Sequence, residues 1–170
     1  MCIRDRGNNW IFYSLLKSRP KKRRIVVSSI EHKSVLLTAR SLVEYGYEVI
    51  ELPVTTDGVV DLATAKALIT EDTLLVAVQY ANNETGVIQP IQQLTELAHR
   101  QGALMHCDAV QGLGKATLNI SELEVDSASF SAHKIHGPKG VGALYLNHGV
   151  CHWPFALPLQ GGGPVSYTHL

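Results

Sequence analysis

The chain has 170 residues, of which 45% are hydrophobic and 18% are charged, a balance typical of one globular domain with a real core. Fifteen Lys and Arg residues balance fifteen Asp and Glu residues, so no net charge argues for binding to nucleic acid or to acidic membranes. No apolar run reaches the roughly 18 residues that a membrane-spanning helix requires.

The two ends of the chain are complementary at the level of codons. The letters MCIRD can be encoded by a sequence whose reverse complement encodes VSYTH, the stretch Val165–His169. Such complementarity resembles a translated sequencing-library adapter, so we expect residues 1–6 and 165–170 to be adapter-derived and exclude them from fold reasoning. Residues 7–164 are then expected to be an interior fragment, a partial domain truncated at both ends.

Between these ends, strand and helix patterns alternate. A strand is expected at 24–29, and a helix follows at 32–46, where apolar residues recur at helical spacing up to a glycine. A strand at 47–53 and a turn precede a helix at 61–69, for which Asp61 is the expected N-cap. The almost wholly apolar strand at 73–80 is typical of a sheet with both faces buried.

The alternation continues in the second half of the chain. A helix is expected at 90–102, beginning with Pro90 and ending at Gly102, and strands are expected at 103–109, 127–132 and 142–147. Strands that alternate with helices predict an α/β layered domain with a largely parallel sheet.

Polar residues follow several of the predicted strands. The carboxyl ends of parallel strands meet at one edge of the sheet, where ligands bind in folds of this kind. The set at this edge combines a histidine, carboxylates, amides, a hydroxyl and an amine, which is more polar chemistry than a structural edge needs. Its members are Glu31, His32, Asn82, Asn83, Glu84, Asp108, Gln111, Ser131, His133 and Lys134.

Pyridoxal phosphate is the ligand whose chemical groups match this set. A lysine such as Lys134 can attack its aldehyde, and a carboxylate such as Asp108 can keep its ring nitrogen protonated. An imidazole such as that of His32 can stack on its ring, and Ser131 with nearby backbone N–H groups can hold its phosphate. The residue types alone therefore indicate a pyridoxal-phosphate site.

Each of these residues also has an ordinary structural interpretation. Lys134 alone is a solvated surface charge, as we expect Lys115 and Lys139 to be. Asp108 and His32 can cap helices, and Gln111 alone is an unremarkable polar residue. The residues at 82–84 can simply build a turn.

Four motifs taken together favour the functional interpretation. The stretches EHKSVL, NNETGVIQPI, HCDAVQGLGK and SFSAHKIHGPKGVGALY resemble, in letters, order and spacing, the class V aminotransferase family, and most closely its cysteine desulfurases of the NifS/IscS kind. The resemblance runs from about Gly7 to Gly163. It implies the cofactor-binding large domain of a fold type I pyridoxal-phosphate enzyme, a three-layer α/β/α structure.

The resemblance implies a role for each matching residue. Lys134 forms the Schiff base with pyridoxal 5′-phosphate, and Asp108 pairs with the pyridine nitrogen. Gln111 donates a hydrogen bond to the phenolic oxygen, while His32 stacks on the ring and assists proton transfers.

Three further residues complete the implied site. Asn83 contacts the cofactor or the substrate carboxylate, and Ser131 and His133 hold the phosphate. In the family, L-cysteine is converted to L-alanine and its sulfur passes to a loop cysteine as a persulfide. The sulfur then moves to an iron–sulfur scaffold or another acceptor protein. The family further implies a cytoplasmic homodimer.

The sequence departs from the family pattern at three places. The phosphate loop that precedes the NN pair in the family has no counterpart before Asn8-Asn9. The stretch Leu159–Gly163 resembles only the start of a loop that reaches the partner subunit. Neither Cys107 nor Cys151 matches the persulfide-forming cysteine.

Two other patterns have weaker functional interpretations. His106, Cys107 and Asp108 include metal-ligand types, but in a strand Cys107 points away from the other two, so we expect no metal site. Cys107 is more simply a small buried residue. The basic run Lys17–Arg24 lacks interleaved aromatics, so a solvated connection is favoured over a nucleic-acid site.

Three hypotheses of function follow. The first is a pyridoxal-phosphate-dependent cysteine desulfurase, and the second is a sibling enzyme on the same scaffold, such as a selenocysteine lyase or an aminotransferase. The third is a non-enzymatic α/β binding module, which covalent binding of the cofactor would exclude.

Overall fold

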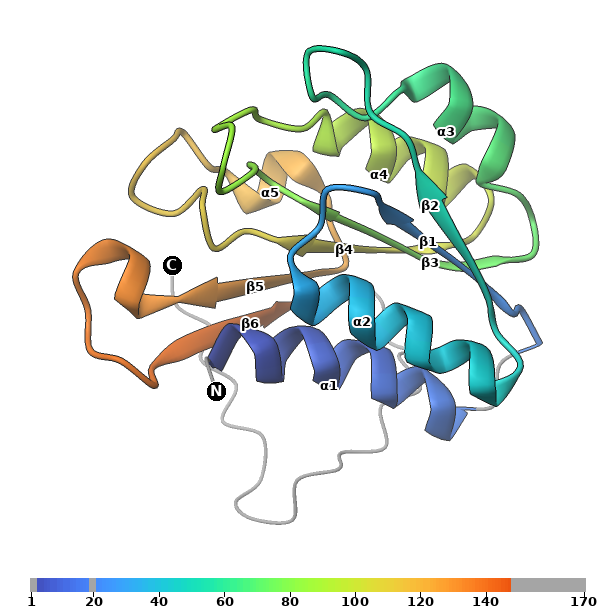
Figure 1. Cartoon of the computed structure of the whole chain (residues 1–170), viewed down its shortest axis with the longest axis horizontal. Coiled ribbons are helices and arrows are strands. Elements are labelled where there is room, and N and C mark those ends of the chain that lie inside the picture. The colour runs from blue at the N-terminus through green and yellow to red at the C-terminus, as the bar shows by residue number, and fades with distance from the viewer. Residues whose placement is uncertain (1–2, 19–20, 148–170) are drawn as a thin grey trace.

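One six-stranded sheet organises the chain. The computed structural model describes residues 3–18 and 21–147, and its strands lie in the order β2-β1-β3-β4-β5-β6 (Figure 1). All neighbouring strands are parallel except the last pair, β5 and β6, which are antiparallel. The bounds are β1 Arg24–Ser28, β2 Glu48–Leu52, β3 Thr73–Gln79, β4 Leu104–Asp108, β5 Ser127–Ser131 and β6 Gly142–Leu146. The predicted largely parallel sheet is thus confirmed.

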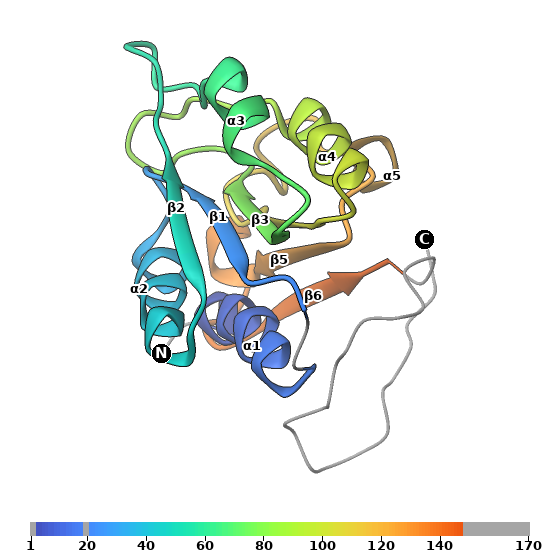
Figure 2. The same ribbon diagram turned by 90° about the vertical axis from the view of Figure 1, so that its right-hand side faces the viewer.

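Helices cover both faces of this sheet (Figures 1 and 2). Helices α1 and α2 lie on one face, whereas α3, α4 and α5 lie on the other. Their bounds are α1 Ile3–Ser18, α2 Lys33–Ser41, α3 Leu62–Leu68, α4 Ile91–Arg100 and α5 Ile120–Leu123, and the 3-10 helices are η1 Leu42–Tyr45 and η2 Ala132–Ile135. The domain is therefore a three-layer α/β/α sandwich, as the resemblance implied.

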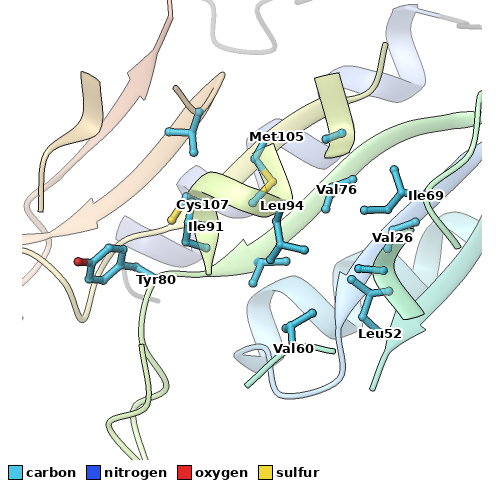
Figure 3. Packing of buried hydrophobic residues seen from close by; sticks show 14 of the residues in the cluster. Val26, Leu52, Val60, Ile69, Val76, Tyr80, Ile91, Leu94, Met105 and Cys107 are labelled. Carbon is cyan, nitrogen blue, oxygen red and sulfur yellow. The ribbon is translucent and has the colours of Figure 1, made fainter. Parts of the chain in front are cut away.

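Each face of the sheet has its own apolar core. Ile91 and Leu94 of α4 pack with Met105 and Cys107 of β4 on one face (Figure 3). On the other face, residues of α1 such as Phe12 pack with β1 and α2. Every residue of β3 is buried because helices cover both of its faces, which explains its unbroken apolar sequence.

A side-chain cap and a glycine account for the ends of two helices. Asp61 caps α3 as predicted, because its carboxylate accepts a hydrogen bond of 2.9 Å from the backbone N–H of Ala63. The predicted helix at 32–46 is α2 continued by η1, and it ends at Gly46 with a φ of 81°, a left-handed conformation that favours glycine. The residues after Asp108 form turns rather than a helix.

The first helix includes residues that the codon pattern marks as adapter-derived. α1 begins at Ile3, so Arg4, Asp5 and Arg6 form its first turn. Arg4 is 9% exposed and lies against the sheet edge that carries the predicted site.

The described part of the basic run makes structural contacts. Lys22 donates hydrogen bonds to the carbonyl groups of Gln101 and Gly102 at the end of α4, with distances of 2.6 and 2.9 Å. The guanidinium of Arg23 lies over the ring of Tyr47, 5.0 Å from its centroid. These contacts tie β1 to its surroundings.

Several features discussed for the sequence fall outside the described residues. They are Cys151, the stretch Leu159–Gly163 and the end 165–170. Within residues 3–18 and 21–147, no helix combines the length and apolar character needed to cross a membrane.

Candidate active site

The carboxyl ends of the parallel strands β1, β3, β4 and β5 lie at one edge of the sheet (Figure 1), and the predicted site residues stand at or after these ends in the chain. His32 follows β1, Asp108 is the last residue of β4, and Ser131 is the last residue of β5. The 3-10 helix η2 begins directly after β5 and carries His133 and Lys134.

Asp108 is the buried carboxylate of this edge, with 4% of its surface exposed. Its Oδ2 accepts a hydrogen bond of 2.9 Å from the Asn8 side-chain amide, and its Oδ1 accepts one of 3.2 Å from the backbone N–H of Val110. Burial raises the pKa of Asp108, while the Asn8 hydrogen bond opposes that rise. A cation placed here would favour the ionised carboxylate.

His32 has a structural contact on one ring nitrogen and faces the site with the other. Its Nδ1 accepts a hydrogen bond of 3.0 Å from the backbone N–H of Ser34, so His32 is the N-cap of α2. The capping alternative is therefore confirmed, and it is compatible with a role in the site. Burial lowers the pKa of His32, as do the charges of Arg4 and Lys134.

Arg4 places a guanidinium between these two residues. Its Nη2 lies 2.6 Å from Nε2 of His32, and its Nε lies 3.9 Å from Oδ2 of Asp108. A planar cation thus lies beside an imidazole and a buried carboxylate. Sequence reasoning missed this contact because it excluded residues 1–6.

Lys134 lies close enough to His32 for its charge to contribute to the lowered pKa of that ring. Its side chain is half-buried, and within the described part of the chain it makes no hydrogen bond or ion pair. Beside it, Ser131 Oγ and His133 Nδ1 lie 2.6 Å apart, and Ser131 is 2% exposed. The predicted amine and the predicted phosphate ligands therefore share one turn after β5.

The other two predicted residues lie in turns and contact other partners. Gln111 accepts a hydrogen bond of 2.7 Å from Lys115, and Asn83 is exposed in the turn after β3. Asn82 builds that turn, because its Oδ1 accepts from the backbone N–H groups of Glu84 and Thr85 at 2.9 Å each. Among the described residues, neither Gln111 nor Asn83 is hydrogen-bonded to Asp108.

A buried polar layer beneath the edge was missed by sequence reasoning. Asn8 and His106 are fully buried, and their side chains lie 3.0 Å apart. No local signal marks them, since Asn8 and His106 are separated by 98 residues. His106 lies in a largely apolar strand, whereas Asn8 has the polar neighbours Arg6 and Asn9, so its sequence context does not set it apart.

Glu31 is a second buried carboxyl group beneath the edge. Its Oε1 accepts hydrogen bonds from Ser28 Oγ and, at 2.7 Å, from the backbone N–H of Gln79. Burial raises the pKa of Glu31 to about 8, and Oε2 has no hydrogen-bond partner in the part of the chain that the structure describes. Glu31 is therefore protonated at neutral pH.

Cys107 takes no part in this edge. It packs into the core on the α4 side (Figure 3), whereas His106 and Asp108 contact Asn8 of α1 on the other face, as the strand alternation predicted. Burial raises the pKa of its thiol. Across residues 3–18 and 21–147, no three His, Cys, Asp or Glu side chains gather as a metal site would require.

Comparison with known proteins places these residues in a family context. The family model described as "Aminotransferase class-V" matches residues 5–168. "Cysteine desulfurase 2" of Trichormus variabilis is 43% identical over 156 residues, which are 92% of this chain and 38% of that protein. "Cysteine desulfurase" of Klebsiella pneumoniae is 45% identical over 143 residues, 84% of this chain and 35% of that protein.

Solved structures agree with the sequence relatives. A structure titled "NIFS-LIKE PROTEIN" matches with a TM-score of 0.88 and 43% identity, covering 96% of this chain and 44% of that one. A structure titled "SspA in complex with cysteine" matches with a TM-score of 0.85 and 31% identity, covering 95% of this chain and 46% of that one. The chain thus spans less than half the length of these proteins.

Proposed function

Because the chain belongs to the aminotransferase class V family, we propose that it is the central part of a pyridoxal-phosphate-dependent cysteine desulfurase. The longer protein, which we call the parent protein, would convert L-cysteine to L-alanine and pass the sulfur to a cysteine of its own. The observation that carries this proposal is the buried carboxylate of Asp108 at the strand edge that also holds His32 and Lys134. Relatives named cysteine desulfurase support the choice of reaction.

The residues at the edge fit the cofactor. The guanidinium of Arg4 is planar and cationic, as a protonated pyridine ring is, and it contacts His32 and approaches Asp108. The edge therefore accepts a flat cation in this position. Asp108 would hold the ring nitrogen protonated, since an opposite charge nearby favours each ionised form.

Other residues would hold the remaining groups of pyridoxal phosphate. Lys134 would attach it through its amine, and Ser131 with His133 would bind its phosphate. Gln111 and Asn83 stay predictions for the phenolic oxygen and the substrate carboxylate. When bound, pyridoxal phosphate supplies an electron sink that stabilises negative charge developing on the substrate.

The contacts of His32 limit what this residue can do. Because Nδ1 accepts from the backbone of Ser34, the neutral ring carries its proton on Nε2. His32 would therefore stack on the ring and donate a hydrogen bond from Nε2. A role in proton transfer would require it to take up a second proton on Nδ1, and hence to give up the cap of α2.

L-cysteine is the substrate that the relatives favour, and one solved relative is titled as a complex with cysteine. A sulfur-acceptor or iron–sulfur scaffold protein would take the sulfur from the parent protein. A homodimer and a cytoplasmic location stay predictions from the family resemblance. The sibling reactions, selenocysteine cleavage and amino-group transfer to a keto acid, differ from the proposed one in their substrates.

Turnover by the parent protein tests the proposal. We expect alanine from L-cysteine, with sulfide released in equal amount when a thiol reductant is present, and loss of both products in Lys134→Ala. The variant Lys139→Ala, which changes an exposed lysine of the following turn, should keep the activity. Turnover of L-selenocysteine or a keto acid without turnover of L-cysteine would overturn the desulfurase assignment.

A further inference from the structure

A line of buried polar side chains runs beneath Asp108. Ser127 Oγ lies 2.8 Å from His106 Nδ1, His106 Nε2 lies 3.0 Å from Asn8 Oδ1, and Asn8 Nδ2 lies 2.9 Å from Asp108 Oδ2. Ser127, His106 and Asn8 are fully buried, and they come from β5, β4 and α1. Residues of three elements thus form one hydrogen-bonded line that ends at the carboxylate of Asp108.

The chemistry of the partners assigns a direction to each hydrogen bond. An ionised carboxylate only accepts, so the amide nitrogen of Asn8 must face Asp108, and its second N–H donates to Ser34 Oγ at 3.0 Å. The amide oxygen then faces His106, which must carry its proton on Nε2. Nδ1 of His106 is left to accept from the hydroxyl of Ser127.

The opposite arrangement carries an electrostatic penalty. If His106 held its proton on Nδ1, Nε2 would need a donor and the Asn8 amide would turn over. Its oxygen would then face Oδ2 of Asp108, and two acceptors would meet in a buried site unless the carboxyl took up a proton. The tautomer of His106 and the ionisation of Asp108 are therefore linked through one amide.

The ionisation of His106 does not disturb this link at neutral pH. Burial lowers the pKa of His106 to about 3, so the ring is neutral and has a single N–H to place. Asp108 itself has its pKa raised by burial, and the Asn8 hydrogen bond is the largest influence that lowers it.

We propose that Asn8 is a positioning residue of the active site, and that His106 fixes its amide so that Asp108 stays ionised toward the ring nitrogen of the cofactor. This inference rests on the proposed function, because it assigns Asp108 to that nitrogen. Asn8 and His106 touch neither cofactor nor substrate in this account. They act through Asp108 alone.

Asn9 offers a matched comparison on the same helix. Its side chain lies 2.6 Å from the hydroxyl of Thr38 on α2, so it joins the two helices without contacting Asp108. Asn9→Ala therefore removes one amide from α1 and leaves the polar line intact, whereas Asn8→Ala breaks it.

The first test is made on the parent protein with pyridoxal phosphate labelled with 15N in its ring. We expect a protonated ring nitrogen in the unchanged protein and in Asn9→Ala. In Asn8→Ala the nitrogen should lose its proton at neutral pH, and the dissociation constant of the cofactor should rise by roughly 10- to 100-fold, the scale for losing a hydrogen bond to a charged group. Identical nitrogen resonances and dissociation constants in the two variants would overturn the inference.

His106 is tested by rescue. His106→Gln keeps an amide N–H that can donate to Asn8, and His106→Leu has no donor. We expect a protonated ring nitrogen in the glutamine variant and an unprotonated one in the leucine variant. A protonated nitrogen in both would contradict the role of His106.

The tautomer of His106 can be measured on the protein without cofactor, so this test does not depend on the proposed function. The 15N resonances of His106 report which ring nitrogen carries the proton, and they do so even if His106→Leu fails to fold. The inference predicts the Nε2–H tautomer, and the Nδ1–H tautomer would overturn it. Failure of the unchanged protein to attach pyridoxal phosphate would instead contradict the proposed function.

Discussion

Nη2 of Arg4 lies 2.6 Å from Nε2 of His32 in a partly buried contact. A guanidinium has only donors, so Nε2 can accept this hydrogen bond when the ring proton lies on Nδ1, which is 2.9 Å from Ser34 Oγ. The cap of α2 requires the other tautomer, because there Nδ1 accepts from the backbone N–H of Ser34. Arg4 and the cap of α2 therefore favour opposite tautomers of His32.

Removal of Arg4 should make room for the cofactor in the 170-residue chain. Arg4 occupies the space between His32 and Asp108 in which the pyridine ring would lie, so it competes with the ring for the same carboxylate. We expect Arg4→Ala to bind pyridoxal phosphate at least about tenfold more tightly, as measured by absorbance titration. Arg6→Ala changes an exposed residue of the same turn and serves as control. Equal affinities of the two variants would contradict this competition.

The origin of Arg4 can be read from DNA. We propose from the codon pattern that residues 1–6 and 165–170 are adapter-derived. Sequencing the source locus across both junctions should give different residues at these positions and, downstream, a loop cysteine. Finding the codons of VSYTHL in genomic DNA would refute the adapter proposal, and a downstream frame without such a cysteine would shift the reaction to a sibling enzyme.

The protonated carboxyl group of Glu31 should govern how stability changes with pH. Its pKa is about 8 in the folded protein against 4.5 for an ordinary glutamate, so its stabilising contribution is complete below about pH 4.5 and is lost as pH rises toward 8. Over this interval the unfolding free energy should fall by about 1.4 kcal/mol per pH unit from this group. Glu31→Gln should remove that slope in urea unfolding of the parent protein.

The control for Glu31 is a glutamate on the exposed face of α4. Glu96→Gln changes a side chain that is 51% exposed, and it should keep the slope of the unchanged protein. The account of Glu31 fails if Glu31→Gln and Glu96→Gln depend on pH in the same way.

Two buried aspartates lie at opposite ends of the strands. Their alanine variants should distinguish a residue needed for activity from one needed only for stability. Asp108 faces the site, whereas Asp126 precedes β5 and accepts a hydrogen bond of 2.6 Å from the backbone N–H of Met105. In the parent protein, Asp108→Ala should lower kcat/KM for L-cysteine by roughly 10²- to 10³-fold, the scale for losing one preorganised electrostatic contact. Its unfolding free energy should fall by only about 1–3 kcal/mol, because the buried donors of Asn8 and Val110 lose their acceptor.

Asp126→Ala should lose stability without losing activity. It leaves a buried backbone N–H without its acceptor, which costs about 1–3 kcal/mol of stability, and the folded enzyme should keep its kcat/KM. Urea unfolding and steady-state assays on both variants decide the matter. Similar losses of activity and stability in both proteins would mean that Asp108 has a structural role only.

The sequence predicted the alternation of strands and helices well because that signal is local. The unbroken apolar run of β3 and the cap at Asp61 each depend on residues within a few positions. The short helix α5 was missed, and no bounds were predicted for α1, whose first turn lies in the excluded residues 1–6.

The candidate site could be predicted only in part. His32, Asp108, Ser131, His133 and Lys134 follow strands, so the topology of a parallel sheet brings them to one edge. Asn8 and Asp108, by contrast, are 100 residues apart and meet only through packing of α1 against the sheet. No spacing or period in the sequence carries that information.

Covalent attachment of the cofactor tests the central claim most directly. The parent protein would be incubated with pyridoxal phosphate, reduced with borohydride and digested, and the labelled peptide identified by mass spectrometry. The account predicts a single reduced label on Lys134, the lysine of η2 next to Ser131 and His133. A label on Lys115 or Lys139 in its place would contradict the site assignment, and no label at all would leave an α/β binding module without this cofactor.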